Sequence, residues 1–478
     1  MSLNSFDFII IGAGISGLNA AYRLQTTFPY RRFAILEARE SIGGTWDLFR
    51  YPGIRSDSDL YTFGFQWFPW NQPNPIAEGG DILRYLDDAA TAHGLKQHIR
   101  FNHRVNSAKW DGSQWILDID HDGNIQQLSA RFVVFATGYY DYYSPLDATI
   151  PGLENFKGAV IHPQFWPEKF DVINKKIVVI GSGATAVTLV PSLAEDAESV
   201  TMLQRSPTYL ASISNGQINS LWTTLLPKLV TYYLRRLWHL IVPQLFYRFC
   251  HSFPNAARSL LQQGIKTQLP PTVPLDPHFK PRYNPWEQRL CACPDGDFFK
   301  AMNSTKAKVE TGIIDQIDEG GIELTSGKRL DADVIVTATG LRMQFFGGIP
   351  IYVHGQKFDP AEKYMWNGLM LQDLPNAILV MGFVNASWTL GADIAMGLSC
   401  RILKHMQKSG YVSVIPTLED CTRLDNRAVM DLKSTYVKRA ARDLPKASRQ
   451  RPWVSRTGYF SDLYFSIFGN LKNGLVFS

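Results

Sequence analysis

Two glycine-rich turns, each followed by a charged residue at the end of the next apolar segment, are the clearest chemical signal in this sequence. An apolar strand is predicted at residues 6–11, directly before the first turn, and a helix directly after it. In this arrangement the glycines permit a tight turn, and a pyrophosphate can lie at the helix N-terminus. Glu37 ends the next predicted strand, residues 33–36, and a carboxylate there accepts hydrogen bonds from a free ribose 2′-hydroxyl. The first turn reads Gly12-Ala-Gly14-Ile-Ser16-Gly17.

The second turn is followed by a cation instead of an acid. Its next predicted strand ends at Arg205, and a guanidinium suits a ribose that carries a 2′-phosphate. Ser206 adds a hydroxyl donor beside it. We therefore predict FAD at the first turn and NADPH at the second. The second turn reads Gly181-Ser182-Gly183-Ala184-Thr185-Ala186.

A single turn of this kind is weak evidence, because glycine-rich turns also occur in ordinary strand–helix units that bind no ligand. Here the strand–turn–helix context is present twice, each time with a residue suited to one type of ribose. The pair therefore favours two dinucleotide sites over two empty turns.

The composition of the chain restricts the class of protein. The 478 residues have 45% hydrophobic and 19% charged content, which is ordinary for a folded protein with two or three domains. A net charge of +5, without a Lys/Arg run or zinc-ligand spacing, argues against nucleic acid as a partner and against a metal site. The chain offers no uncharged apolar stretch of about 18 residues, so we expect no transmembrane span.

The cysteine count points to a reducing compartment. Five cysteines, without a segment that resembles a secretion signal, favour free thiols and a cytoplasmic location. The first strand starts too close to the first residue to leave room for a signal peptide, which is a further expectation of the same kind. The cysteines are Cys250, Cys291, Cys293, Cys400 and Cys421.

The pattern along the chain predicts an α/β protein with two Rossmann-like domains. Residues 1–145 read as the first part of an FAD domain, and residues 146–340 read as an NADPH domain with a helical insertion at about residues 215–270. Residues 341–478 carry an apolar strand at 377–381 and a helix at about 390–408, and we expect them to complete the FAD domain. The NADPH domain is thus predicted to be inserted into the FAD domain.

The segment between Pro227 and Pro243 has two possible interpretations. Its apolar residues follow helical spacing, with most of its polar residues on the opposite side. Such a helix usually buries its apolar stripe against a core or covers a pocket. The alternative is weak contact with a membrane surface, which would make the protein peripheral to the membrane.

Three further motifs carry a family resemblance. The segment at 156–167 has Phe, Gly, His, Trp and Pro at the fixed positions of the pattern F-x-G-x-x-x-H-x-x-x-W-P, and Trp-Pro is the ending that distinguishes it from related N-hydroxylases. Residues 43–57 match G-G-x-W-x-x-x-x-Y-P-G-x-x-x-D. Residues 283–291 read Tyr-Asn-Pro-Trp-Glu-Gln-Arg-Leu-Cys, and this segment, which contains Arg289, is called the arginine loop. The chain therefore resembles the type I Baeyer–Villiger monooxygenases, and most closely the subgroup of the ethionamide-activating monooxygenase. The fingerprint residues are Phe156, Gly158, His162, Trp166 and Pro167.

The resemblance implies a reaction and a set of binding residues. It implies that NADPH reduces FAD, that O₂ then gives a C4a-peroxyflavin, and that oxygen is inserted into ketones or added to sulfides. The implied FAD residues are Gly12, Gly14, Ser16, Gly17, Glu37, Gly44, Thr45, Trp46, Asp47, Asp57 and Val105. The implied NADP residues are Arg55, Ser56, Asp57, Gly181, Ser182, Gly183, Ala184, Thr185, Ala186, Arg205 and Ser206.

Arg289 and Asp57 are the predicted catalytic residues. A guanidinium is always cationic and has a rigid donor fork, so Arg289 suits the stabilisation of an anionic oxygen beside the flavin. Asp57 would orient it. Without the resemblance, a surface arginine and a turn aspartate would be the simpler interpretation. His162 is predicted to organise domain closure and not to act as a general base.

The substrate and the rival functions follow from the same residues. The aromatic residues Trp67, Trp70, Trp286 and Trp388, with the region 221–249, suggest an apolar ketone or sulfide. A flavin monooxygenase that oxidises only sulfur or nitrogen is the main alternative. A flavin disulfide reductase would need a redox cysteine pair, for which the chain offers only Cys291 and Cys293. A flavin-binding redox sensor is the non-enzymatic alternative, and the sequence leaves the oligomeric state open.

Overall fold

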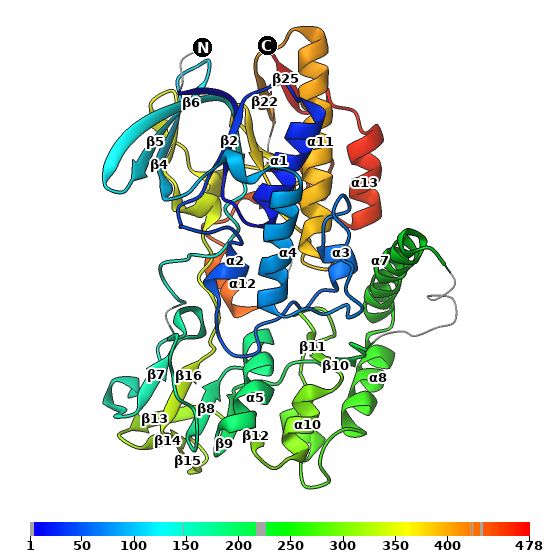
Figure 1. Ribbon diagram of the computed structural model, residues 1–478. Helices are drawn as coiled ribbons and strands as arrows, with labels where there is room; N and C mark the ends of the chain where they lie inside the picture. The colour runs from blue at the N-terminus through cyan, green and yellow to red at the C-terminus, as the bar shows by residue number, and fades with distance from the viewer. Residues whose placement is uncertain (1–3, 147, 217–225, 421, 423, 431–433) are drawn as a thin grey trace.

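The structure is a computed structural model that describes residues 4–146, 148–216, 226–420, 422, 424–430 and 434–478. These residues form two α/β units, one above the other in Figure 1, each built around a sheet with parallel strands. The α/β class and the Rossmann-like arrangement predicted from the sequence are confirmed.

The first unit is built on a mixed sheet with the strand order β18-β17-β4-β5-β6-β1-β2-β3, in which β21 also pairs with β6. Its central strand β1 pairs in parallel with β2 and with β6, while β5 pairs antiparallel with both β4 and β6. The strands are β1 (Ser5–Ile11), β2 (Phe33–Leu36), β3 (Ile99–Arg100), β4 (His103–Trp110), β5 (Trp115–His121), β6 (Asn124–Phe135), β17 (Ile351–Val353), β18 (Gln356–Lys357) and β21 (Ala377–Leu379).

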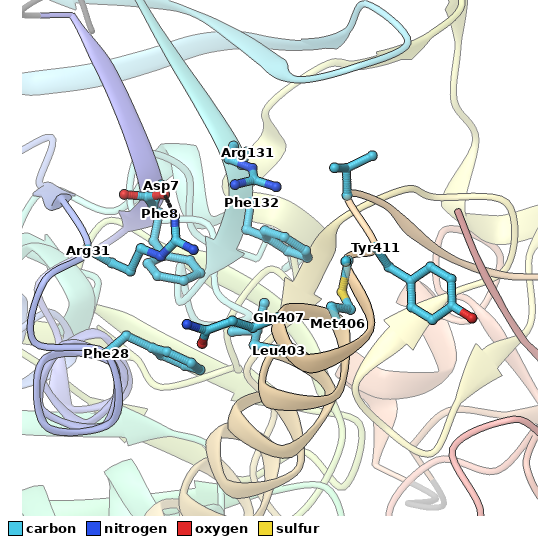
Figure 2. Close-up of a pocket in the computed structure, with 12 residues that line it drawn as sticks. Asp7, Phe8, Phe28, Arg31, Arg131, Phe132, Leu403, Met406, Gln407 and Tyr411 are labelled. Carbon is cyan, nitrogen blue, oxygen red and sulfur yellow. Dashed lines mark hydrogen bonds and ion pairs between the residues drawn. The ribbon is translucent and has the colours of Figure 1, made fainter.

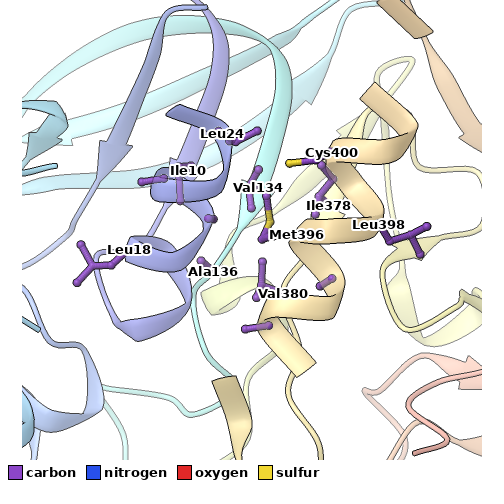
Figure 3. Close-up of a cluster of buried hydrophobic side chains, with 14 of the residues drawn as sticks. Ile10, Leu18, Leu24, Val134, Ala136, Ile378, Val380, Met396, Leu398 and Cys400 are labelled. Atoms are coloured by element: carbon purple, nitrogen blue, oxygen red, sulfur yellow. The ribbon is translucent and has the colours of Figure 1, made fainter. Parts of the chain in front are cut away.

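Apolar residues on both faces make β1 a buried strand. Phe8 and Ile10 lie in one hydrophobic cluster and Ile9 and Ile11 in another, as expected for a parallel strand covered on both sides. Figure 3 shows the first cluster, in which α1 and α11 pack side by side on the sheet. The helices of this unit are α1 (Ile15–Thr27), α2 (Thr45–Leu48), α3 (Leu60–Phe63), α4 (Gly79–Ala92), α11 (Trp388–Ser409), α12 (Thr435–Ala440) and α13 (Tyr459–Phe468).

The end of the chain returns to the first unit. β17 pairs in parallel with β4, and β21 pairs in parallel with β6, so strands that follow residue 340 extend the sheet that begins at the N-terminus. Short pairs complete this region: β19 (Met365–Trp366) with β20 (Met370–Leu371), β22 (Val414–Pro416) with β25 (Leu475–Phe477), and β23 (Arg427–Ala428) with β24 (Lys446–Ala447).

The second unit has a fully parallel sheet with the order β12-β9-β8-β16-β7. α5 and α10 contribute to the hydrophobic cluster on one face, and the antiparallel strands β13–β15 contribute to the cluster on the other. Its sheet strands are β7 (Ala159–Ile161), β8 (Lys176–Ile180), β9 (Ser199–Gln204), β12 (Ala307–Thr311) and β16 (Val334–Thr337). The other elements are α5 (Ala184–Asp196), α9 (Leu275–His278), α10 (Asp297–Asn303), β13 (Ile314–Asp318), β14 (Gly321–Leu324) and β15 (Arg329–Asp331).

A helical segment lies between the parallel strands β10 (Leu210–Ile213) and β11 (Cys291–Pro294). It consists mainly of α7 (Lys228–Ser252) and α8 (Pro254–Lys266). Residues 217–225 of the predicted insertion lie outside the described residues. α7 also continues beyond Pro243, which the sequence pattern marked as its end. A proline inside a helix removes one backbone hydrogen bond, and a helix of 25 residues retains the others.

The orientation of α7 contradicts the expectation of a buried apolar stripe. Tyr232, Arg236 and Cys250 are its buried residues, whereas Leu234 and Leu237 are about half exposed. Helical spacing predicts which residues share a side of the helix, but not which side faces the protein. In this helix the side that carries most of the arginines packs inward.

Candidate functional site

The first glycine turn connects β1 to α1 with a backbone that only glycine accommodates. Gly12 has a φ of +104°, and a Cβ there would lie 2.7 Å from the carbonyl oxygen of Ala136. A Cβ on Gly17 would overlap the carbonyl oxygen of Gly12 at 1.8 Å. Within the described residues, no side chain caps α1 at Gly14 and its first turn has no acid. Its N–H groups can therefore bind an anion.

Glu37 lies directly beneath this turn. One carboxylate oxygen accepts the Ala13 N–H at 2.7 Å, and the other accepts the Arg39 N–H at 3.1 Å. The residue is 7% exposed, and burial raises the pKa of its carboxyl group while the hydrogen bonds from Ala13 and Arg39 work against the rise. A carboxylate has about four acceptor positions, so it can accept further hydrogen bonds.

The motif around Gly44 faces the first turn. A Cβ on Gly44 would lie 3.2 Å from the Cα of Gly14 and 3.3 Å from the hydroxyl of Tyr142. The Thr45 hydroxyl is 3.3 Å from that same tyrosine hydroxyl. Trp46 packs edge-to-face on Phe63, with ring centroids 5.6 Å apart. The structure therefore places Thr45 and Trp46 beside the turn.

Three other predicted FAD residues have partners within the first unit. Asp47 is buried, lies 2.5 Å from Arg39 in an ion pair and accepts a hydrogen bond from Ser41 at 2.6 Å, so it stabilises this loop. The hydroxyl of Ser16 accepts the indole N–H of Trp388 at 2.8 Å. Val105 is buried on β4, which pairs with β5.

The second turn, between β8 and α5, is more open. Gly181 has a φ of +142°, and a Cβ there would lie 2.2 Å from the carbonyl oxygen of Ala338. A Cβ on Gly183 would meet no described atom within 4 Å. Arg205 is exposed and has no hydrogen-bond or ion-pair partner among the described residues. The Ser182 hydroxyl donates to the carbonyl of Ser206 at 2.9 Å, which holds the two predicted NADP segments together.

The segment from Tyr51 to Asp57 connects the two units. A Cβ on Gly53 would lie 3.0 Å from the Cβ of Ser192, so this loop packs closely on α5. Burial raises the pKa of Tyr51 to about 12, and an interaction of its hydroxyl with the side chain of Thr185 works against this rise. The predicted NADP residue Thr185 is thus engaged by a residue of the first unit.

Arg55 and Ser56 are held within this connecting segment. Arg55 forms an ion pair with Asp297, the first residue of α10, and its guanidinium is 3.5 Å from the carbonyl of Ala292. The Ser56 hydroxyl donates to the carbonyl of Ser58 at 2.7 Å. Sequence motifs gave no indication of Asp297, because it belongs to none of them.

Asp57 and Arg289 are brought together where the two units meet. Burial raises the pKa of Asp57. The positive charge of Arg289, and to a smaller extent that of Arg55, works against this rise. The side chains of Asp57 and Arg289 are both accessible to solvent. Arg289 precedes β11, whose first N–H, from Cys291, donates to the carbonyl of Tyr209 at 2.9 Å.

The arginine loop is supported by the helical segment. Trp286 packs edge-to-face on Tyr247 of α7, with ring centroids 5.4 Å apart, and interacts with the thiol of Cys250. Arg258 of α8 donates to the side-chain oxygen of Asn284 at 2.8 Å. α7 and α8 therefore determine where the loop lies relative to Asp57.

The fingerprint segment 156–167 packs along the edge of the second unit. A Cβ on Gly158 would lie 2.3 Å from the carbonyl oxygen of Asp333, and Phe156 is buried. His162 Nδ1 accepts the Gln164 N–H at 3.2 Å, and burial lowers the pKa of its ring, with the Gly340 backbone working against this. Trp166 packs against the second unit's core, and the adjoining Pro167 is exposed.

Two tryptophans are placed differently from expectation, whereas the described cysteines are free thiols as predicted. Trp70 is 5% exposed and belongs to the first unit's core, and Trp67, which stacks on Tyr22 with ring centroids 3.9 Å apart, packs against that core. Trp388 stacks on Tyr139 near the first turn, at 4.8 Å. The cysteines within the described part of the chain are free and buried, and Cys421 lies outside that part.

Sequence reasoning missed Tyr139 and Tyr142. Both come directly after the strand that ends near Ala136, in the run Tyr139-Tyr140-Asp141-Tyr142-Tyr143. Their position at the carboxyl end of a parallel strand was the available signal, because ligands of such sheets bind there.

A cavity of about 190 Å³ lies elsewhere in the first unit. Figure 2 shows Asp7, Arg31 and Arg131 on one side of it and Met406 on the other. Because Asp7 is near the start of β1 and the glycine turn is at its end, this cavity is remote from the candidate site.

Comparisons with known proteins agree with this geometry. The chain is 45% identical to the probable FAD-binding monooxygenase AlmA of Acinetobacter baylyi, over 95% of this chain and 92% of that protein. It is 44% identical to the FAD-containing monooxygenase EthA of Mycolicibacterium smegmatis, over 96% of this chain and 94% of that protein. A family profile described as pyridine nucleotide-disulphide oxidoreductase matches residues 9–232, which is less than half of the chain.

Solved structures show the same fold at low sequence identity. An oxidised steroid monooxygenase bound to NADP matches with a TM-score of 0.79 at 23% identity, covering 99% of both chains. A cyclohexanone monooxygenase bound to ε-caprolactone matches with a TM-score of 0.76 at 20% identity, covering 99% of this chain and 100% of that one. At this identity the match supports the arrangement of the two units and leaves the substrate open.

Proposed function

The chain belongs to the family of FAD-containing monooxygenases, and on that premise we propose that it oxygenates apolar ketones and sulfides with FAD, NADPH and O₂. We assign FAD to the unit formed by residues 1–145 and 341–478, and NADPH to the unit formed by residues 146–340. The observation that supports this proposal is the electrostatic interaction of Arg289, in the loop before β11, with Asp57, on the segment that connects the two units.

The residues at the first turn fit FAD. The helix begins at Gly14 without a side-chain cap among the described residues, which leaves N–H groups for the pyrophosphate. Glu37 retains acceptor capacity for ribose hydroxyls, and the closely facing Gly14 and Gly44 give a ligand access to backbone groups. When bound and reduced, the flavin supplies the activation of O₂ and the transfer of one oxygen atom.

The second turn fits NADPH. Its helix also begins, at Gly183, without a side-chain cap among the described residues, and its first turn has no acid. Arg205 is exposed beside this turn and can bind a 2′-phosphate through its donor fork.

Arg289 is proposed to stabilise negative charge on oxygen at the point of transfer. It is permanently cationic, and Asp57 beside it restricts the orientation of the guanidinium. Because Arg289 is exposed, its guanidinium can contact both a ligand and the substrate. The supporting contacts of Trp286 and Asn284 with α7 and α8 keep the loop in place, so the cation is preorganised.

The cysteine chemistry argues against a disulfide reductase. Burial and, with a smaller effect, the carboxylate of Asp57 raise the pKa of Cys291 to about 12. Burial also raises the pKa of Cys293 well above its usual value. Neither thiol forms a thiolate readily near neutral pH, and the thiolate is the reactive form in such enzymes.

Replacement of Arg289 tests the proposal. Arg289→Ala is expected to retain oxidation of NADPH but to lower the rate of oxygenated product by about 100-fold or more, the effect of removing one preorganised donor. Product is measured by mass spectrometry with an aryl ketone and an aryl sulfide, and NADPH oxidation by absorbance. Arg282→Ala, an exposed arginine directly before the same loop, is the matched control and should retain product formation.

Two results would contradict the proposal. Normal product formation by Arg289→Ala would remove this residue from the reaction. Oxygenation of the sulfide alone by the unaltered protein would replace ketone oxygenation by the second candidate, a monooxygenase restricted to sulfur and nitrogen.

A further inference from the structure

α7 exposes an apolar face that its own fold does not cover. Trp238 is 61% exposed and Leu234 is 52% exposed, although both belong to a helix of 25 residues. Contiguous exposed apolar surface of this kind marks an interaction site more often than isolated exposed residues do. The exposed apolar residues of α7 are Leu229, Val230, Tyr233, Leu234, Leu237, Trp238, Ile241, Val242 and Leu245.

The polar side of α7 fixes this orientation. Arg235 donates to the hydroxyl of Tyr61 at 3.0 Å, and the buried guanidinium of Arg236 donates to the carbonyl of Tyr61. The charges of His239 and Arg236 also lower the pKa of Asp59, working against the rise caused by burial. Turning the apolar face inward would break these contacts and leave buried polar groups without partners.

α13 extends the same apolar surface. Leu240 of α7 packs against the same small cluster of buried residues as Tyr459 and Leu463 of α13, so both helices lie against one part of the first unit. Figure 1 shows them on the same side of the molecule. The exposed large hydrophobic residues of α13 are Phe460, Tyr464, Ile467 and Phe468. Together with the nine exposed apolar residues of α7, they define the α7–α13 surface.

The charged residues of the sequence around α7 are all basic. Residues 199–275 contain no Asp or Glu, although the chain as a whole has 48 Lys and Arg against 43 Asp and Glu. Lys228, Arg248 and Lys266 are exposed on α7 and α8. The basic residues of this segment are Arg205, Lys228, Arg235, Arg236, Arg248, Arg258 and Lys266.

We propose that the α7–α13 surface docks onto a membrane that contains anionic lipids. An apolar helix face with cations near it is the pattern of helices that lie in the interface plane, and each nearby Lys or Arg adds attraction to anionic headgroups. Trp238, Tyr233 and Tyr464 are ring types that favour the boundary between headgroups and acyl chains. No helix in the described part of the chain is long and apolar enough to cross a bilayer, so the contact is with the surface.

Charge favours lipid over a second copy of the chain. A twofold interface would place the same patch on both sides, which brings the exposed cations of one copy near those of the other. An anionic bilayer neutralises these cations instead. The proposal is independent of which substrate the enzyme oxygenates.

Sedimentation with lipid vesicles tests the proposal. The full-length flavin-loaded protein is expected to bind vesicles that contain phosphatidylglycerol, and to bind pure phosphatidylcholine vesicles much less. Binding should fall as salt rises, because ionic strength screens exposed charges. The double substitution Leu234→Glu with Trp238→Glu should lower the partition coefficient by roughly tenfold or more, since it removes apolar area and adds negative charge.

Ile125→Glu is the matched control. Ile125 is 64% exposed on β6 of the first sheet, so it is an apolar surface residue outside α7 and α13. This variant should bind anionic vesicles as the unaltered protein does. Both variants should retain NADPH oxidation, which verifies that they are folded.

A milder variant covers the case in which the double substitution does not fold. Trp238→Phe should retain binding, and it should lose part of the fluorescence quenching that brominated phosphatidylglycerol causes in the unaltered protein. Absence of binding to anionic vesicles at low salt would overturn the proposal. Equal binding of anionic vesicles by the double variant and the unaltered protein would also overturn it. So would an unaltered protein that binds no vesicles but self-associates, if the double variant loses that self-association.

Discussion

The two glycine turns follow the same strand–turn–helix plan, but the protein surrounds their charged downstream residues in different ways. Glu37 is 7% exposed and already accepts two backbone N–H groups, while Arg205 is exposed and has no partner among the described residues. Gly44 and Tyr142 close over the first turn, whereas a Cβ on Gly183 would meet no described atom within 4 Å.

This difference relates each site to the behaviour of its cofactor. A buried residue with fixed hydrogen bonds is preorganised and loses little entropy on binding, which suits a cofactor that stays bound. An exposed side chain must be ordered by its ligand, which suits a cofactor that enters and leaves in each turnover. Substitutions at the first turn are therefore expected to lower the stability of the protein. Substitutions at the second turn are expected to weaken cofactor binding, and more so at residues that contact the cofactor directly.

The largest expected effect is that of Gly12→Ala. The new Cβ would lie 2.7 Å from the carbonyl oxygen of Ala136, at a φ of +104°. A positive φ and overpacking together cost roughly 2–5 kcal/mol, so the free energy of unfolding should fall by that amount. Chemical denaturation of the protein measures this change, and the bound flavin should be lost in the same variant.

A glycine in an open environment is the control for this substitution. A Cβ on Gly80, inside α4, would meet no described atom within 4 Å, so Gly80→Ala should leave stability unchanged or slightly raised. Equal stability of the Gly12 and Gly80 variants would mean that the first turn is less constrained than its contacts indicate.

Arg205→Ala is expected to have the next largest effect. Losing a charged hydrogen bond to a 2′-phosphate costs about 1.5–3 kcal/mol, which corresponds to a rise of about 10- to 150-fold in KM for NADPH. KM for NADH should change little, because NADH has no 2′-phosphate. Steady-state kinetics with both cofactors measures the ratio, and a parallel rise for NADH would contradict the assignment of Arg205.

Local features of the sequence were sufficient to predict the turns but not the contacts between distant segments. The strand at residues 33–36 and the glycine positions follow from short-range pattern, and the structure has β2 at Phe33–Leu36. The outward direction of α7 was not predictable, because periodicity defines a stripe without saying what will cover it. Its direction depends on Tyr61, which lies far away in sequence.

The candidate site shows the same limit. The arginine loop and Asp57 were found through motifs, but the ion pair of Arg55 with Asp297 joins a motif residue to one outside any motif. Trp67 and Trp70 were expected near substrate because of their residue type, and the structure packs Trp70 in the first unit's core and Trp67 against it. Residue type indicates what a side chain can bind, and tertiary contacts decide whether it is available.

Glu37→Gln should reduce FAD affinity by a smaller factor than Arg205→Ala raises KM for NADPH. The amide retains one acceptor oxygen but loses the charge, so we expect about a 5- to 10-fold weaker affinity, the difference between a charged and a neutral hydrogen bond. Burial raises the pKa of Glu37. The carboxylate of the unaltered protein is therefore protonated, as pH falls, at a higher pH than an ordinary glutamate.

FAD affinity of the unaltered protein should accordingly decline as pH falls through this raised pKa, and reach a plateau above it. Glu37→Gln should remove this dependence, because the amide does not titrate. Flavin fluorescence titrations across mildly acidic pH measure both effects. An identical pH dependence in the two proteins would assign the acid sensitivity to another group.

Gly183→Ala should have the smallest effect on the protein itself and tests why a glycine is present there. Gly183 has a φ of −79°, which any residue adopts, and its Cβ would meet no described atom within 4 Å. Stability should therefore change by no more than about 0.5 kcal/mol, as for ordinary surface substitutions. A rise in KM for NADPH without a loss of stability would show that the glycine leaves space for ligand. A loss of stability comparable to that of Gly12→Ala would mean instead that both turns are constrained by the protein alone, and the contrast between them would fail.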